Sequence, residues 1–439
     1  MSGTATKFAD QALRADLDLP EERRFLFLQG PTSHFFYKLA QELRSRGHRV
    51  DKVNFNLGDH LYWGAQKAFH FRRDSSQLAD YINQLFAHNQ YTDVLVLGEN
   101  RPVHRCLKEI VAKYNAQLHV IEEGYLRPHW LTLESHGVNG HSQLPKDPNW
   151  YRKAVKLIPK CENSDPVSNA VWLLALHEVC YHLPNILNTI FYPGYKTHRP
   201  MISGLELAGW AWRFMKMPRW EKQDAKQIAA LVDSEVAYYL LPLQLDSDAQ
   251  IIYHSPFDNM AQIIEKVLRS FAKHSPSAAK LVIKNHPLDT GYFNFKQFIN
   301  TQAKKLAVSE RVLYLESGHL PTLFDANCKG VVTINSTVGT SSLIHHCPTI
   351  ALGDAIYDMQ GLTYQHGLDK FWRQGQAPDK ALFDAFRKVV IHTTQLNGGF
   401  YSVQGVKLAV PACADIMTQA QSPLAMLKDQ VRQADDKIQ

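Results

Sequence analysis

Polar residues that can bind an anion follow an apolar run at residues 331–334, late in the chain. Asn335, Ser336 and Thr337 come directly after this run, ahead of a helix that we expect to begin near Thr340. The first N–H groups of a helix lack partners within the helix, and the helix dipole adds positive potential there. The stretch can therefore hold a phosphate or a carboxylate. A plain helix cap is the alternative, because Ser and Thr favour that position.

A second apolar run, at residues 281–283, ends in Lys284, Asn285 and His286. In open α/β sheets, ligands bind outside the carboxyl ends of the strands. If the two runs form neighbouring strands, Lys284 and His286 face the same crevice as the hydroxyl groups of the first stretch.

Carboxylates follow two other apolar runs. Glu122 and Glu123 end one run and precede a Gly that permits a sharp turn, with a solvated turn as the alternative. Gln244 ends another run, and Asp246 and Asp248 follow it. Asp248 can act as a nucleophile or as a general base. Its alternative is an Asx turn or a helix N-cap.

Hydrophobic periodicity predicts the elements that position these residues. Strand-like and helical patterns alternate in both halves, which is typical of doubly wound α/β domains. We expect strands at 24–31, 50–55, 93–98, 117–121, 239–244, 281–283, 312–315, 331–334 and 349–353. We expect helices at 34–46, 78–88, 104–114, 260–274, 293–306 and 319–326, and an exposed, charged helix at 422–439.

The fold class predicted is therefore α/β, with two Rossmann-like domains and a helical insertion. The expected parts are an N-terminal domain at 22–150, a helical insertion and linker at 151–237, a C-terminal domain at 238–375, and C-terminal helices at 376–439. The linker itself is expected near residues 221–238. The aromatic, basic stretch at 168–220 either packs on the core or forms a platform on an anionic membrane, where Trp, Tyr, Lys and Arg are favoured.

Composition narrows the class of protein. The 439 residues carry a formal charge of +6, which suits an anionic substrate or membrane surface but is too small to argue for nucleic acid. The six cysteines have no C-x-x-C spacing, which indicates reduced thiols and a cytosolic compartment. We expect no signal peptide and no membrane-spanning helix, since the N-terminus is polar and no long apolar window exists.

Five short motifs, in order along the chain, resemble those of the capsule polysaccharide biosynthesis family, and within it the KpsS-type β-Kdo transferases. The motifs are Phe27-Leu28-Gln29-Gly30-Pro31, Glu122 through Pro128, Gln244 through Ile251, Asn285-His286-Pro287 and Asn335 through Gly339. The resemblance implies a GT-B arrangement and retaining transfer of the acidic sugar Kdo from CMP-Kdo. The implied acceptor is a lyso-phosphatidylglycerol lipid at the inner face of the cytoplasmic membrane, where this sugar starts the capsule linker.

The resemblance also implies roles for individual residues. Asp248 would be the nucleophile, Glu123 the general base for the acceptor hydroxyl, and His286 a contact to the CMP phosphate or the Kdo carboxylate. The implied donor-binding residues are Gln244, Lys284, Asn285, Asn335, Ser336, Thr337 and Arg127. We expect no metal and no cofactor, and CMP-Kdo is the expected donor substrate. Partners would be the phospholipid acceptor and other capsule proteins, with no nucleic acid.

Two other functions stay open at this point. The first is transfer of another CMP-activated acidic sugar, such as a sialic acid, which would need the same anion-binding residues. The second is a capsule assembly or export component that holds lipid-linked polysaccharide without catalysis. Replacing Asp248 separates the second from an enzyme.

Overall fold

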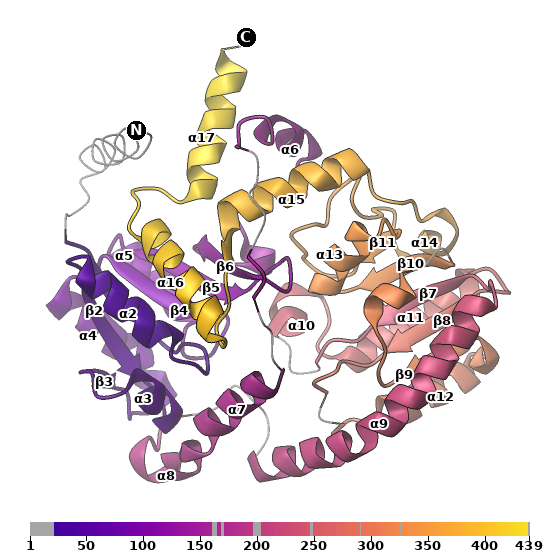
Figure 1. The fold of residues 1–439 in the computed structure, drawn as a ribbon, viewed down its shortest axis with the longest axis horizontal. Coiled ribbons are helices and arrows are strands. Elements are labelled where there is room, and N and C mark those ends of the chain that lie inside the picture. The colour runs from indigo at the N-terminus through magenta and orange to yellow at the C-terminus, as the bar shows by residue number, and fades with distance from the viewer. Residues whose placement is uncertain are drawn as a thin grey trace. The chain divides into compact units, whose positions relative to one another are not determined.

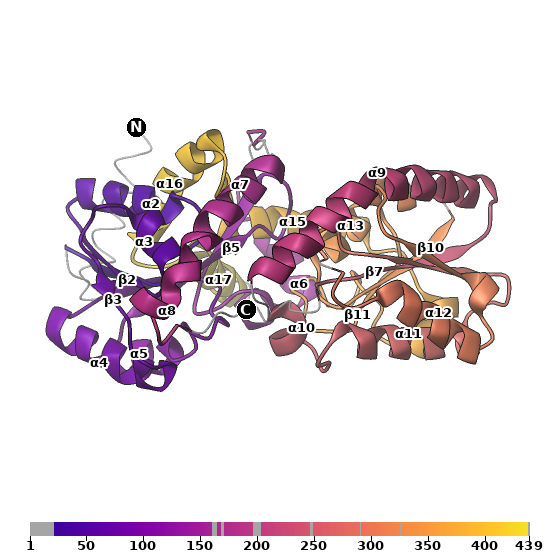
Figure 2. The ribbon, with the colours of Figure 1, turned by 90° about the horizontal axis from the view of Figure 1, so that it is seen from below.

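The structure is a computed structural model that describes residues 22–159, 165–167, 171–195, 203–245, 249–289, 291–324 and 327–437 (Figure 1). The chain forms two compact units. Unit 1 comprises Met1–Leu144, Lys153–His198 and Lys388–Gln439, and unit 2 comprises Pro145–Arg152 and Arg199–Arg387. Each unit contains one mainly parallel sheet with helices on both faces, which confirms the predicted α/β class (Figure 2).

The sheet of unit 1 has the order β12-β6-β5-β4-β1-β2-β3 within the described residues. Its strands are β1 (Arg24–Phe27), β2 (Arg49–Asn54), β3 (Phe69–His70), β4 (Asp93–Leu97), β5 (Gln117–Glu123), β6 (Trp130–Ser135) and β12 (Gln395–Asn397). The first five are parallel, whereas β6 runs antiparallel to both β5 and β12. The sequence did not predict β3, β6 or β12. Two of these strands are very short, and β12 reaches its partner from the far end of the chain.

The helices of unit 1 cover both faces of this sheet, with α2 and α16 on one face and α4 and α5 on the other (Figure 2). They are α2 (Phe35–Ser45), α3 (Leu57–Trp63), α4 (Leu78–Asn89), α5 (Leu107–Lys113), α7 (Val171–His182), α8 (Asn188–Phe191), α16 (Val403–Met417) and α17 (Pro423–Asp436). The 3-10 turns are η1 (Ser75–Gln77), η2 (Asn139–His141) and η3 (Pro184–Leu187). Helix α17 was expected to be exposed, but it buries Leu424, Leu427 and Val431 because its apolar residues share one face. The elements α6 (Pro148–Ala154) and α15 (Lys380–Thr394) lie where the chain passes between the units.

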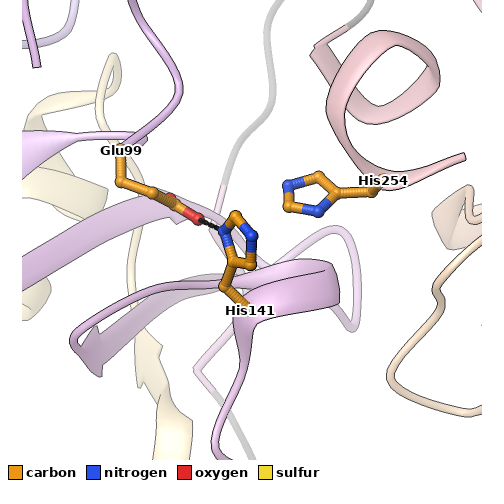
Figure 3. A group of neighbouring side chains, drawn as sticks. All are labelled: Glu99, His141 and His254. Carbon is orange, nitrogen blue, oxygen red and sulfur yellow. Dashed lines mark hydrogen bonds and ion pairs between the residues drawn. The ribbon is translucent and has the colours of Figure 1, made fainter. Parts of the chain in front are cut away.

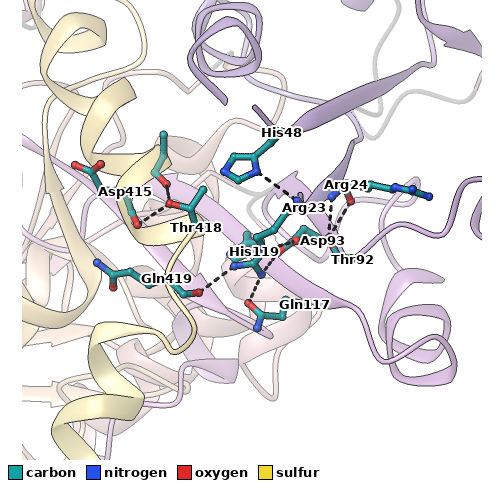
Figure 4. A network of polar contacts seen from close by, with 11 residues as sticks. Arg23, Arg24, His48, Thr92, Asp93, Gln117, His119, Asp415, Thr418 and Gln419 are labelled. Carbon is teal, nitrogen blue, oxygen red and sulfur yellow. Dashed lines mark hydrogen bonds and ion pairs between the residues drawn. The ribbon is translucent and has the colours of Figure 1, made fainter. Parts of the chain in front are cut away.

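A buried charge network closes the amino edge of the first sheet (Figure 4). The Arg23 guanidinium donates to Asp93 through Nε at 2.8 Å and Nη2 at 2.5 Å, and to the Gln419 carbonyl at 2.9 Å. His119 Nε2 lies 2.7 Å from the same carboxylate. Burial pushes the pKa of Asp93 upward, but the hydrogen bond and charge of His119, with the charge of Arg23, outweigh it and hold this pKa below its usual value. The network ties the C-terminal segment to β1.

The sheet of unit 2 has the order β11-β10-β7-β8-β9, and all its pairs are parallel. The strands are β7 (Tyr238–Pro242), β8 (Lys280–Lys284), β9 (Val312–Leu315), β10 (Cys328–Thr333) and β11 (Thr349–Ala351). The helices are α9 (Ser203–Asp233), α10 (Ala249–His254), α11 (Met260–His274), α12 (Phe295–Lys305), α13 (Thr337–Ile344) and α14 (Leu368–Gln374), with 3-10 turns η4 (Ser309–Arg311) and η5 (Leu320–Leu323).

Two expectations about unit 2 are wrong. Strands β8 and β10 are not neighbours, because the chain winds outward from β7 in both directions and leaves β7 between them. Residues 221–233 are not a linker but the last turns of α9, which buries Ile228 and Leu231 against the sheet. The polar residues around these two apolar side chains hid the helical spacing. Among the described residues, no helix has the length and apolar character needed to cross a membrane.

Candidate functional site

The carboxyl edge of the second sheet is ordered by Asn335, which follows β10. Asn335 Oδ1 accepts a hydrogen bond from Gln244 Nε2 at 3.3 Å. Its Nδ2 donates to the carbonyl oxygens of Gln250 at 2.8 Å and His254 at 3.1 Å. Asn335 therefore fastens α10 to the ends of β7 and β10, and the structure brings it together with the predicted Gln244.

The N-terminus of α13 follows at the same edge. Helix α13 begins at Thr337, three residues before the predicted start, because Ser336 caps it and accepts from Val338 N at 3.2 Å. The Tyr357 hydroxyl donates to the Ser336 carbonyl at 2.7 Å, and a Cβ on Gly339 would overlap that hydroxyl. The cap accounts for the Ser336 hydroxyl, and Thr337 is half-buried at the first turn.

A cavity of about 550 Å³ lies at the end of β11, within unit 2. Its lining comprises Tyr253, Ser255, Pro256, Ala351, Leu352, Gly353, Asp354 and Asp358. The backbone N–H of Asp354 donates to the His254 carbonyl at 2.7 Å, so the cavity wall is joined to the α10 end that Asn335 also holds. Its volume is in the range of small-ligand sites. Two aspartates in the lining would repel a phosphate but can accept hydrogen bonds from hydroxyl and amino groups.

Lys284 and Asn285 do not reach an open crevice. The Lys284 side chain is buried, and burial lowers the pKa of its ammonium, with the Asp224 charge opposing that shift. Asn285 is also buried, and its Nδ2 donates to Asp289 and Glu316 at 3.0 Å each. Arg213 lies 3.3 Å from both of these carboxylates and completes a buried network.

His286 is the one residue of this motif that is only half-buried. Its Nδ1 accepts from the backbone N–H of Leu288 at 3.1 Å, which places the proton of the neutral ring on Nε2. Asn285 Oδ1 in turn accepts from the His286 N–H at 2.8 Å. The buried network below therefore sets the position of the histidine.

In unit 1, the two predicted carboxylates have different surroundings. Strand β5 runs on through Glu122 and Glu123, which pair with β6, so they lie inside the strand rather than after it. Side chains alternate along a strand, and the two therefore face opposite ways. Glu122 Oε2 accepts from Asn139 Nδ2 at 2.7 Å. Glu123 is exposed, and within the described ranges no side chain donates a hydrogen bond to its carboxylate.

Protein around the Glu123 carboxyl raises its pKa despite this exposure, and the nearby charge of Arg127 opposes the shift. Arg127 is itself exposed. Gly124 follows, and a Cβ there would overlap the Trp130 carbonyl. The glycine is needed for this close approach of backbone and not for the sharp turn that the sequence predicts.

Further polar residues at this edge escaped prediction. Glu99 follows β4, and its Oε1 lies 3.0 Å from His141 Nδ1 (Figure 3) and 3.3 Å from Val138 N, from which it accepts. Arg101 Nη1 donates to Gln29 Oε1 at 3.2 Å. Glu99 and Arg101 directly follow a strand that was predicted, so the rule applied to Glu123 would have found them.

Helix α7 adds polar groups to the same edge. Gln29 Nε2 donates to the Tyr181 hydroxyl at 3.2 Å, and that hydroxyl donates to Asp59 Oδ1 at 2.8 Å. The Thr32 hydroxyl donates to Glu178 Oε1 at 2.8 Å. Unit 1 thus gathers carboxylates, amides, hydroxyls and the Arg101 guanidinium at the carboxyl edge of its sheet, and the charge of Arg127 lies near Glu123 at the same edge. This set is suited to binding a polar substrate. Asp248, the predicted nucleophile, lies outside the described residues, as does Asp246.

Comparison with known proteins gives the family. Residues 92–401 match the family described as capsule polysaccharide biosynthesis protein. The chain is 33% identical to "Capsule polysaccharide export protein KpsS" of Escherichia coli over 386 residues, 86% of this chain and 97% of the relative. It is 33% identical to "Capsule polysaccharide modification protein LipB" of Neisseria meningitidis serogroup A over 397 residues, 88% of this chain and 93% of the relative.

Among solved structures, the β-Kdo 2,7 transferase of Thermosulfurimonas dismutans KpsC matches with a TM-score of 0.43 and 13% identity, covering 90% of this chain and 100% of that one. The family match spans well over half of the 439 residues, and the first two relatives are covered over most of their length. The chain therefore belongs to the capsule polysaccharide biosynthesis family.

Proposed function

We propose that this protein is a retaining glycosyltransferase that moves Kdo from CMP-Kdo to a lyso-phosphatidylglycerol-type lipid and so starts the capsule linker. Membership of the capsule family supports a role in building that polymer. The observation that carries a catalytic role is Glu123, a carboxylate with a raised pKa and no hydrogen-bond donor among the described side chains. Such a group can act as a general base toward an acceptor hydroxyl.

In the proposed reaction, Asp248 attacks the anomeric carbon of Kdo, and the bond to the CMP phosphate breaks. CMP leaves with the electron pair of that bond, and a glycosyl-enzyme ester remains. The acceptor hydroxyl oxygen then attacks the anomeric carbon and displaces Asp248, while Glu123 takes the hydroxyl proton. Two displacements give net retention of configuration.

Unit 2 would supply the residues that bind the donor. The α13 N-terminus with Thr337, together with His286, would meet the phosphate or the carboxylate of the donor. The aspartate-lined cavity suits the hydroxyl and amino groups of the nucleoside instead. We assign Lys284 and Asn285 to holding the His286 loop, and Gln244 and Asn335 to holding α10. Arg127 would lie near the negative charge of either substrate.

The proposal also includes a GT-B arrangement of the two units, independence from metal ions, and a cytoplasmic location on the inner face of the membrane. Metal independence has a direct test, since chelation should leave the transfer rate unchanged. Added Mg²⁺ should likewise have no effect.

The experiment that tests the proposal offers the purified protein CMP-Kdo or a CMP-sialic acid, each with the lyso-lipid acceptor, and measures CMP release. We expect CMP release with CMP-Kdo and the acceptor, and none with the CMP-sialic acid. Release only with the sialic acid donor would transfer the proposal to the other acidic sugar. Donor without acceptor should add the mass of one Kdo to the peptide containing Asp248, and active turnover with no adduct would contradict the nucleophile.

A second candidate is a non-catalytic component of capsule assembly or export, which the name of the Escherichia coli relative favours. This candidate predicts that Asp248→Ala retains capsule formation in cells. Loss of transfer in that variant, with unchanged thermal unfolding, would exclude it.

A further inference from the structure

Eight large apolar side chains are exposed along α7, η3 and α8 in unit 1. We call them the apolar face, and its members are Trp172, Leu176, Val179, Leu183, Ile186, Leu187, Ile190 and Phe191. Within α7, the spacing of Trp172, Leu176 and Val179 by four and three residues places them along one side of the helix. Trp172 and Ile190 leave 69% and 71% of their surface in solvent. Soluble proteins rarely expose large apolar patches without a binding role.

The apolar face points outward because the opposite side of the same segment is bonded to α3. Asn185 Oδ1 accepts from Gly58 N at 2.9 Å, and Asn188 Oδ1 accepts from Leu57 N at 3.0 Å. Tyr181 is buried on this inner side. Figure 1 shows α7 and α8 at the border of unit 1, beside α3. The polar inner side therefore holds the segment in place, and the apolar face is exposed among the described residues.

Charge is nearly absent from the segment but positive at its border. Residues 171–195 contain no Lys, Arg or Asp, and Glu178, the one carboxylate, accepts a hydrogen bond from Thr32. Exposed Arg72 lies with its guanidinium carbon 5.7 Å from the Tyr192 ring centroid, just beyond α8. Exposed Arg73 follows it in the chain. An apolar face with arginines at its border fits the interface of an anionic bilayer.

We infer that the apolar face docks the protein on an anionic lipid bilayer, with Trp172, Ile186 and Ile190 entering the boundary between headgroups and acyl chains. The inference deepens the proposed function and rests on it in one respect, the presence of the acceptor in that bilayer. Helix α7 carries both the apolar face and the hydroxyl of Tyr181 that bonds to Gln29 at the carboxyl edge. Docking would thus hold the carboxyl edge of the first sheet close to the lipid surface.

The test is co-sedimentation of the full chain with vesicles, in the absence of any sugar donor. Wild type should bind vesicles that contain phosphatidylglycerol at least tenfold better than vesicles of phosphatidylcholine alone. The double variant Ile186→Asp/Ile190→Asp should lose at least tenfold in binding, because two charges would enter the apolar interface. Val403→Asp is the matched control, since Val403 is 86% exposed at the start of α16 and outside the apolar face.

The arginine border gives an independent variant. Arg72→Glu/Arg73→Glu should weaken binding to phosphatidylglycerol vesicles severalfold and remove most of its salt dependence. Unchanged thermal unfolding is expected for all these exposed substitutions.

Two results would overturn the inference. One is equal vesicle binding by wild type and the Ile186→Asp/Ile190→Asp variant. The other is a wild-type dimer in light scattering that this variant dissociates, with no vesicle binding by either, because the apolar face would then join two copies of the chain. A protein that binds vesicles as expected but transfers no sugar would refute the proposed function alone.

Discussion

Charged side chains at the two edges of the first sheet have opposite surroundings. At the amino edge, Arg23, Asp93 and His119 are buried and bonded to one another, and the pKa of Asp93 is held low. At the carboxyl edge, Glu123 is exposed, has no donor among the described side chains, and has a raised pKa. A paired, buried charge contributes to stability, whereas a carboxylate without a partner is ready to take a proton or a ligand. The proposed function therefore assigns substrate to the carboxyl edge and leaves the amino edge a structural role.

The largest effect is expected at the amino edge. Asp93→Ala leaves the buried Arg23 charge without its partner, which should lower the free energy of unfolding by about 3–5 kcal/mol. Urea and thermal unfolding measure this change. Asp415→Ala is the control, since Asp415 pairs with Arg46 at the surface and should cost about 0–1 kcal/mol. Equal losses of stability at the two positions would contradict the structural role of the amino edge.

The carboxyl edge should show the reverse pattern. Glu123→Gln should reduce the rate of Kdo transfer by about 10²–10⁴-fold, because the amide cannot accept the acceptor's proton. Its unfolding should match wild type. Glu122→Gln is the matched control on the same strand, and it should keep most of the transfer rate while weakening the bond to Asn139. A larger loss of transfer in Glu122→Gln would reassign the base to Glu122.

The pH dependence of stability distinguishes buried carboxyls with opposite shifts. Burial raises the pKa of Glu134 from 4.5 to about 7, although Ser142 and Tyr125 donate to it. Its folded form prefers the proton, so its contribution is full below pH 4.5 and is lost as pH rises to about 7. Asp93 behaves in the opposite sense, and its contribution is lost as pH falls below 3.8.

Glu134→Gln tests this assignment. It should flatten the fall in the urea midpoint between about pH 5 and 7, an effect of about 1–3 kcal/mol. Tyr125→Phe offers a second readout, because loss of its hydrogen bond should raise the pKa of Glu134 further. A midpoint that rises with pH in wild type over this range would contradict the raised pKa.

The smallest effect is expected at the carboxyl edge of the second sheet. It tests whether the polar groups there are bonded within the protein, as at the amino edge of the first sheet, or available to a ligand, as at its carboxyl edge. Ser336→Ala removes the cap of α13 and should cost about 0.5–2 kcal/mol in unfolding. If the hydroxyl serves only as a cap, KM for CMP-Kdo should stay within about twofold of wild type. Ser336→Gly is the control, since glycine is tolerated at an N-cap. A KM that rises in both variants without loss of stability would assign Ser336 to the donor instead.

The sequence by itself determined the elements with strong local periodicity. The bounds of α11 and β9 agree with the prediction, because each apolar pattern reports one buried face directly. The α/β class followed from the alternation of such patterns. Polar residues at the ends of apolar runs indicated Glu123, His286 and Ser336 as candidate site residues.

Tertiary structure alone decided which of these polar residues stay accessible. Lys284 and Asn285 end a strand as predicted, yet α9 and the Arg213 network bury them, and no local pattern reports a helix that packs from elsewhere in the chain. The pairing of Arg23 with Asp93 spans 70 residues and depends on the order of strands in the sheet. Strand β12 likewise joins the first sheet from the far end of the chain. Burial and pairing depend on which residues are neighbours in space. The spacing of residues along the chain reports only the neighbours within one helix or strand.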